Sequence, residues 1–256
     1  ELWFQNRMLR EAAALHYTAV EEAERARPFA QGAPEAVVPL GLDPAEFAAA
    51  PPPGAFRAAH PGIGERRILL FLSRIHEKKG LDLLLPAFQR ALEKQGDLQL
   101  VIAGPDEGAE AAARRLAASL GIEDRVSFPG LLGGREKLAA LADCSLFVLT
   151  SYQENFGLSV AEALAMGRPV LISDRVNIWR ELKQDGAAFV VPCETGAIAA
   201  ALDEALSDPA RLEAMGGAAR RCLERRFHRD RMAEGLEHLY EGLAAGGDVR
   251  RARGGV

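Results

Sequence analysis

The feature that most constrains this chain is a regular alternation of short apolar runs with longer alanine-rich segments through the middle of the sequence. Runs such as ILLFLS and LFVLT contain almost no polar residues, which is typical of parallel strands covered by helices on both faces. The segments between them carry apolar residues at helical spacing, and strands that alternate with helices predict βαβ units. The expected class is therefore α/β, with a Rossmann-like, doubly wound parallel sheet.

The pattern gives explicit bounds for these elements. We expect strands at Ile68–Ser73, Leu98–Ala103, Val126–Phe128, Leu146–Thr150, Pro169–Ser173 and Ala188–Val191. We expect helices between them at Leu81–Lys94, Ala109–Leu120, Arg135–Ala142, Leu158–Met166 and Asn177–Lys183. The rest of the chain is predicted to be helical, at Glu194–Leu206, Pro209–Arg226 and Asp230–Leu243.

Both ends of the chain differ from this middle. The first 38 residues read as helix, strand, helix and strand, and residues 44–64 are rich in Pro, Ala and Gly, a composition that resists regular structure and suits a linker. We therefore expect residues 1–42 to be the end of a first domain, 43–66 a linker, 67–245 a second domain and 246–256 a disordered tail. The chain begins with Glu1, and its earliest methionine is Met8, which favours a fragment.

Charge and cysteine content exclude several function classes. The net charge of −5 gives no global positive field for nucleic acid, so no nucleic-acid partner is expected. The cysteines Cys144, Cys193 and Cys222 fit neither a disulfide framework nor a zinc site, which indicates reduced thiols and a cytoplasmic protein. The apolar runs of about five residues are far shorter than the roughly 20 that cross a bilayer.

Ligands of a doubly wound sheet bind where the strands end, so the residues after each strand are the candidates. Arg74 and Lys79 follow the first strand and precede a helix, which predicts an anion site, although a solvated basic loop has the same composition. Gly104 and Gly130 follow the next two strands. They allow backbone to approach a ligand, or simply form turns.

The loop and helix after the fourth strand carry the most information. Glu154 precedes the helix and Glu162 lies within it, between Leu158 and Met166 on one apolar stripe. A buried carboxylate there needs hydrogen-bond donors, and sugar hydroxyls are suitable. A surface glutamate beside a loosely packed stripe, or one bonded to a neighbouring backbone N–H, is the structural alternative.

With these residues in place, the sequence resembles the group-1 (family 4) retaining glycosyltransferases of the GT-B fold. Glu154 and Glu162 match the family's paired glutamates in ENFGLSVAEALAMGRPVL, and Arg74 with Lys79-Gly80 matches its Arg…Lys-Gly element. IAGPDEG, RVSFPG and VVPLGLDPAEF match three further motifs in the expected order. The resemblance covers essentially residues 15–245.

The resemblance implies a donor site for a nucleotide-diphosphate sugar. It implies that Glu162 binds ribose hydroxyls and Glu154 binds hexose hydroxyls, while Arg74 and Lys79 hold the diphosphate. It further implies that backbone N–H groups face the sugar and diphosphate at Asn155, Phe156, Gly157 and Leu158. Arg74, Lys79 and Glu154 are thus the expected catalytic residues, and Gly104 and Gly130 are expected to line the donor.

The resemblance also sets expectations for cofactors and partners. The absence of an Asp-x-Asp motif favours a metal-free reaction, so no cofactor is expected. Ser73 stands where the family usually has Gly, which leaves the donor geometry open. The acceptor (saccharide, lipid-linked or small molecule) is unknown, and most of the N-terminal acceptor domain is expected to lie outside this chain. The fragment alone should therefore bind donor but transfer poorly.

Two alternatives stay open at this point. A non-catalytic nucleotide-sugar-binding or scaffold module would have the same fold. A run of arginines could attract anionic lipid and give peripheral contact with the inner membrane surface, although a solvated helix face is the commoner reading. These arginines are 220, 221, 225, 226, 229 and 231. A dinucleotide-dependent oxidoreductase is disfavoured, because no G-x-G-x-x-G follows a strand.

Overall fold

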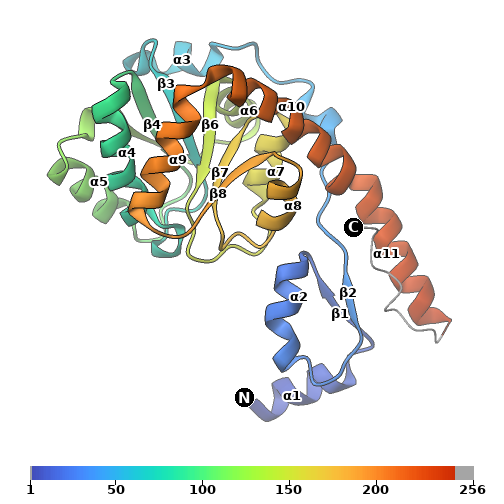
Figure 1. Cartoon of the computed structure of the whole chain (residues 1–256). Coiled ribbons are helices and arrows are strands. Elements are labelled where there is room, and N and C mark those ends of the chain that lie inside the picture. Colours follow the sequence, from blue (N-terminus) through green and yellow to red (C-terminus); the bar gives the residue numbers. More distant parts are fainter. Residues whose placement is uncertain (1, 246–256) are drawn as a thin grey trace.

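The computed structural model describes residues 2–245, and its centre is a six-stranded parallel sheet (Figure 1). The strand order is β5-β4-β3-β6-β7-β8. The strands are β3 (Arg67–Leu72), β4 (Leu98–Ala103), β5 (Val126–Gly130), β6 (Cys144–Leu149), β7 (Val170–Ser173) and β8 (Ala188–Val191). This is the expected doubly wound α/β fold, and its order reverses between β3 and β6.

Helices cover both faces of the sheet, which explains why its strands are apolar along their whole length. They are α4 (Leu81–Gln95), α5 (Glu110–Ser119), α6 (Gly134–Asp143), α7 (Leu158–Ala165), α8 (Trp179–Gln184), α9 (Thr195–Ser207) and α10 (Pro209–Arg226). The side chains of β3 from Ile68 to Phe71 are fully buried, as are those of β6 from Leu146 to Leu149. The two central strands therefore form the middle of the core.

The segment expected to be an irregular linker is partly helical. The prediction that it lacks regular structure was therefore wrong. It contains two 3₁₀ turns, Pro44–Phe47 and Pro61–Ile63, and helix α3 (Ala55–Ala59). Phe47, Phe56 and Ile63 are buried in the main core. Although the segment is rich in proline and glycine, these three apolar side chains pack it against the sheet domain.

Asp143, at the end of α6, fixes the start of α3. Its carboxylate accepts hydrogen bonds from the backbone N–H groups of Gly54 and Arg57. Asp143 is buried. A side chain 89 residues away thus supplies the cap that the sequence around Gly54 lacks.

The N-terminal residues form a separate small unit. It comprises α1 (Leu2–Glu11), β1 (Leu15–Tyr17), α2 (Val20–Ala26) and β2 (Glu35–Val37), and β1 and β2 pair in parallel. The long C-terminal helix α11 (Arg229–Ala244) leaves the sheet domain and runs beside this unit (Figure 1). Leu239 of α11 packs with Ala36 of β2 in a core of their own. Helix α11 therefore belongs as much to the N-terminal unit as to the sheet domain.

A backbone crossing ties these parts together. The N–H of Leu42 donates to the carbonyl of Phe227 at 2.8 Å, and the N–H of Arg229 donates to the carbonyl of Leu42 at 2.9 Å. The expected tail, residues 246–256, lies outside the described residues. No helix in the described part of the chain is long and apolar enough to cross a membrane.

The Asp143 cap gives a stability prediction. We expect Asp143→Ala to lower the free energy of unfolding by about 2 kcal/mol, because two partly buried backbone N–H groups lose their acceptor. Urea denaturation followed by circular dichroism measures this. Glu136→Gln, on the exposed side of the same helix, is the control and should change stability by less than about 0.5 kcal/mol. Equal midpoints for Asp143→Ala and the wild type would contradict the capping role.

Candidate functional site

The loops after β3 and β6 meet at the point where the strand order reverses. The Thr150 hydroxyl donates to the carbonyl of Gly80 at 3.1 Å, and the N–H of Tyr152 donates to the carbonyl of Lys78 at 2.8 Å. Gly80 has a φ of +69°, and a Cβ there would lie 2.2 Å from the carbonyl oxygen of Thr150. Only glycine fits this close approach.

An ion pair between Lys79 and Glu154 joins the two loops. The Lys79 side chain is 7% exposed and that of Glu154 is 19% exposed. The backbone of Glu154 is fixed by the loop after β7, because its N–H donates to Arg175 and its carbonyl accepts from Asn177. The structure therefore brings together two of the three predicted catalytic residues, in a nearly dry environment.

Helix α7 begins close in sequence to Glu154 of this ion pair. Gly157 is the N-cap residue and has a φ of +78°. Within the described residues, the backbone N–H groups of residues 156–159 have no hydrogen-bond acceptor. Phe156 is buried edge-on against Phe227, with ring centroids 5.3 Å apart, whereas Leu158 is half exposed. A set of backbone donors without acceptors therefore lies at the positive end of a helix, and of its residues Leu158 is exposed while Phe156 and Gly157 are buried.

Arg74 lies on the surface and pairs with Glu107. The two carboxylate oxygens of Glu107 accept from one guanidinium nitrogen of Arg74, at 2.8 and 3.0 Å. Both side chains are substantially exposed, so this pair contributes little to stability. Arg74 is thus free to exchange Glu107 for an anionic ligand at small cost.

Glu162 finds a partner that sequence reasoning missed. Its Oε1 atom lies 2.7 Å from Nζ of Lys137 in α6, and its side chain is 17% exposed. Neither a loosely packed surface position nor a bond to neighbouring backbone describes it. The sequence does place Lys137 shortly after the glycine-rich turn that follows β5, which is a position for a candidate site residue. It gives no sign that Lys137 in α6 pairs with Glu162 in α7. Lys137 adds a cation to the candidate site.

The two glycines predicted to line the site differ in their surroundings. Gly104 has a φ of +148°, and a Cβ there would lie 1.8 Å from the carbonyl oxygen of Ser73, so it allows the loops after β3 and β4 to touch. Its N–H donates to the carbonyl of Gly130 at 2.8 Å. A Cβ on Gly130 would meet nothing within 4 Å. Gly130 therefore faces open space, whereas Gly104 is packed.

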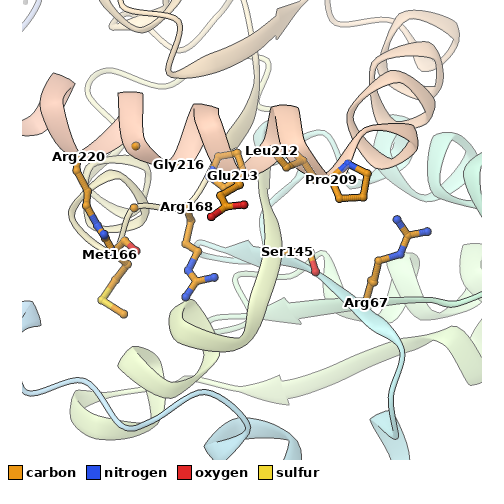
Figure 2. A pocket seen from close by; sticks show the side chains of 12 residues that line it. Arg67, Ser145, Met166, Arg168, Pro209, Leu212, Glu213, Gly216 and Arg220 are labelled. Carbon is orange, nitrogen blue, oxygen red and sulfur yellow. Dashed lines mark hydrogen bonds between the residues drawn. The ribbon is translucent and has the colours of Figure 1, made fainter.

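A hollow of about 400 Å³ lies at the end of the sheet opposite to the candidate site (Figure 2). It is lined by residues near the starts of β3, β6 and β7 and by α10. Its guanidinium groups have protein partners: Arg67 binds Asp97, and Arg168 and Arg220 donate to backbone carbonyls. This hollow shares none of the predicted site residues.

The structure also bears on the predictions about the cysteines, the arginine-rich stretch and metal binding. Cys144, Cys193 and Cys222 are free thiols, and burial raises the pKa of Cys144 to about 12, so it is protonated at neutral pH. In the arginine-rich stretch, Arg225 and Arg226 bind Asp185. This pairing favours a structural role over lipid attraction. No group of three or more His, Cys, Asp or Glu within residues 2–245 is arranged to hold a metal ion.

Comparison with known proteins finds similarity over the residues that form the candidate site. The family model described as glycosyl transferases group 1 matches residues 55–222, which include every predicted site residue. The D-inositol 3-phosphate glycosyltransferase of Kineococcus radiotolerans is 33% identical over 202 residues, covering 72% of this chain and 46% of the relative. The phosphatidyl-myo-inositol mannosyltransferase of Mycobacterium leprae is 29% identical over 228 residues, covering 88% of this chain and 58% of the relative.

Solved structures agree with the fold. Sucrose-phosphate synthase from Thermosynechococcus elongatus superposes with a TM-score of 0.82 at 26% identity, covering 96% of this chain and 62% of that one. HepE from Anabaena, in complex with UDP-glucose, gives a TM-score of 0.79 at 20% identity, covering 93% and 67%. This chain spans about half the length of the curated relatives it matches. On the family match and the shared fold, the chain belongs to the group 1 glycosyl transferases of the GT-B fold.

Proposed function

We propose that this chain carries the donor half of a retaining glycosyltransferase that uses a nucleotide-diphosphate sugar. The observation that carries the proposal is that the Lys79–Glu154 pair and the unpaired backbone N–H groups at the start of α7 lie together where the strand order reverses. Cations and unpaired backbone N–H groups bind a diphosphate, and carboxylates bind sugar hydroxyls. Both kinds of group occur here on adjacent loops.

The proposed roles follow from these positions. Lys79, Arg74 and the N–H groups of residues 156–158 hold the diphosphate, and Glu154 accepts hydrogen bonds from the hexose. The N–H of Asn155 donates to Oε1 of Glu154 at 3.2 Å, so it orients that carboxylate. Glu162 accepts from the ribose hydroxyls, which replace or join Lys137 as donors, and Gly130 leaves room for the nucleoside.

The charges also suit the chemical step. As the bond between the sugar and the diphosphate breaks, negative charge grows on the leaving diphosphate and the sugar becomes oxocarbenium-like. Lys79, Arg74 and the helix N-terminus stabilise that growing charge more than they stabilise the ground state, which lowers the barrier. These groups supply the positive charge without a metal in the proposed mechanism.

The acceptor side of the reaction is a separate proposal. The unit formed by α1, β1, α2 and β2 is two parallel strands wide, and parallel strands are stable in larger sheets covered on both faces. We infer that further strands of an N-terminal domain complete it and bind the acceptor. This chain alone is then expected to bind donor and to transfer poorly.

Donor binding tests the proposal. We expect Glu162→Ala and Lys79→Ala each to weaken binding by about 1.5–3 kcal/mol, the range for hydrogen bonds to charged groups. Isothermal titration of the chain with UDP-glucose and with GDP-mannose measures this. Lys94→Ala, which removes an exposed lysine paired with Asp203, is the matched control and should bind as the wild type does. Absence of binding by the folded wild type to either nucleotide sugar would overturn the proposal.

The ion pair gives an independent prediction about stability. Lys79→Met leaves Glu154 mostly buried without its cation, so we expect the free energy of unfolding to fall by about 3 kcal/mol. Adding Glu154→Gln removes the stranded charge and should recover most of that loss, while donor binding stays weak. Urea unfolding of the single and double variants makes the comparison. A double variant no more stable than Lys79→Met would show that the pair is not buried as described.

A further inference from the structure

Helix α2 of the N-terminal unit presents acidic side chains to the sheet domain. Arg180 of α8 binds Glu21 at 2.8 Å and Glu24 at 2.7 Å. The third acidic residue, Glu22, lies between these two in the sequence and contacts the loop after β6 instead. The N-terminal unit therefore contacts both α8 and the loop that carries Glu154.

Asn155 makes the contact to Glu22. Its Nδ2 donates to Oε1 of Glu22 at 2.8 Å. Its Oδ1 accepts from Nδ2 of Asn177, in the loop after β7, at 3.1 Å. Its backbone N–H donates to Oε1 of Glu154 at 3.2 Å. A single residue thus touches the N-terminal unit, the neighbouring loop and the carboxylate of the candidate site.

Glu22 is itself held rigidly. Its Oε2 accepts from the backbone N–H of Thr18 at 2.7 Å and from the Thr18 hydroxyl at 2.9 Å. With Asn155, the carboxylate has three donors on two oxygens. Since these bonds fix Glu22 at the start of α2, the position of α2 determines where Asn155 can place its amide. A hydrogen-bonded path therefore runs from α2 through Asn155 and Glu154 to Lys79.

We propose that Asn155 is a positioning residue that transmits the seating of α2 to Glu154, so that the hexose is held tightly only when the N-terminal unit is docked. This inference rests on the proposed donor site. Arg180 supplies a separate part of the docking contact without touching Glu154. The Glu22–Asn155 bond supplies the link between docking and hexose binding.

Exchanging the hydrogen-bond donor and the hydrogen-bond acceptor between Asn155 and Glu22 tests this link. Asn155→Asp places a carboxylate against Glu22, so the hydrogen bond is lost and two like charges face each other. Glu22→Gln alone leaves one amide oxygen for the donors of both Thr18 and Asn155, so it also weakens the link. In the double variant Asn155→Asp/Glu22→Gln, the new amide donates to the new carboxylate, and Asn177 keeps its acceptor. All substitutions are close to isosteric, and the double variant has the net charge of the wild type.

The readout is the ratio of the dissociation constant for UDP to that for UDP-glucose, with GDP and GDP-mannose as the second pair. This ratio isolates what the hexose contributes. We expect about a tenfold fall in the ratio for Asn155→Asp, from loss of a charged hydrogen bond, a smaller fall for Glu22→Gln, and recovery in the double variant. Asn155→Asp/Glu11→Gln is the matched control, because it removes the same charge from the N-terminal unit at an exposed residue of α1 that contacts neither Asn155 nor Arg180, and it should not recover.

Each outcome decides between the possibilities. Recovery in the Glu22→Gln double variant alone supports the link. If both double variants recover equally, or neither does, while the wild type binds the sugar nucleotide, the link is wrong and the donor site stands. If the folded wild type binds none of the four nucleotides, the proposed function fails, and the inference fails with it.

Discussion

The ion pair between Lys79 and Glu154 is the interaction on which the candidate site depends. Moving two charges out of water costs several kcal/mol each, and attraction offsets this only when the geometry is good and the remaining lone pairs are satisfied. Here the surrounding loops provide that geometry. Gly80 lets the loop after β3 touch Thr150, and the loop after β7 fixes the backbone of Glu154. The site is therefore preorganised by contacts among three loops.

The position of this pair follows from the sheet. Strands β3 and β6 are neighbours where the strand order reverses, so the loops that follow them meet at one edge of the sheet. A lysine after one strand can then pair with a glutamate after the other. The same topology places α7, with its unpaired N–H groups, beside these loops. The strand order therefore determines where the candidate site lies as well as the overall fold.

Much of the fold could be predicted because its signals are local. The strands Leu98–Ala103 and Ala188–Val191 and the helix Pro209–Arg226 have the bounds expected from periodicity and flanking residues. Helix α3 was missed because its cap, Asp143, is distant in the sequence and its surroundings are rich in proline and glycine.

The site was predictable in its residue types but not in its pairings. Glu154 and Glu162 could be singled out from their place after a strand and on an apolar stripe. Their partners Lys79 and Lys137 come from other elements, and only tertiary structure brings them within reach. The contact between Glu22 and Asn155 spans 133 residues and two units, and no local pattern could reveal it. Gly104, predicted to line the donor, is tightly packed against Ser73.

A crystal structure of this chain with UDP-glucose or GDP-mannose tests the central claim most directly. The account predicts the diphosphate within hydrogen-bond distance of Nζ of Lys79 and of the backbone N–H groups at the start of α7, with the hexose against Glu154. A nucleotide sugar bound elsewhere, for example in the arginine-lined hollow at the opposite end of the sheet, with the Lys79–Glu154 pair undisturbed, would contradict it.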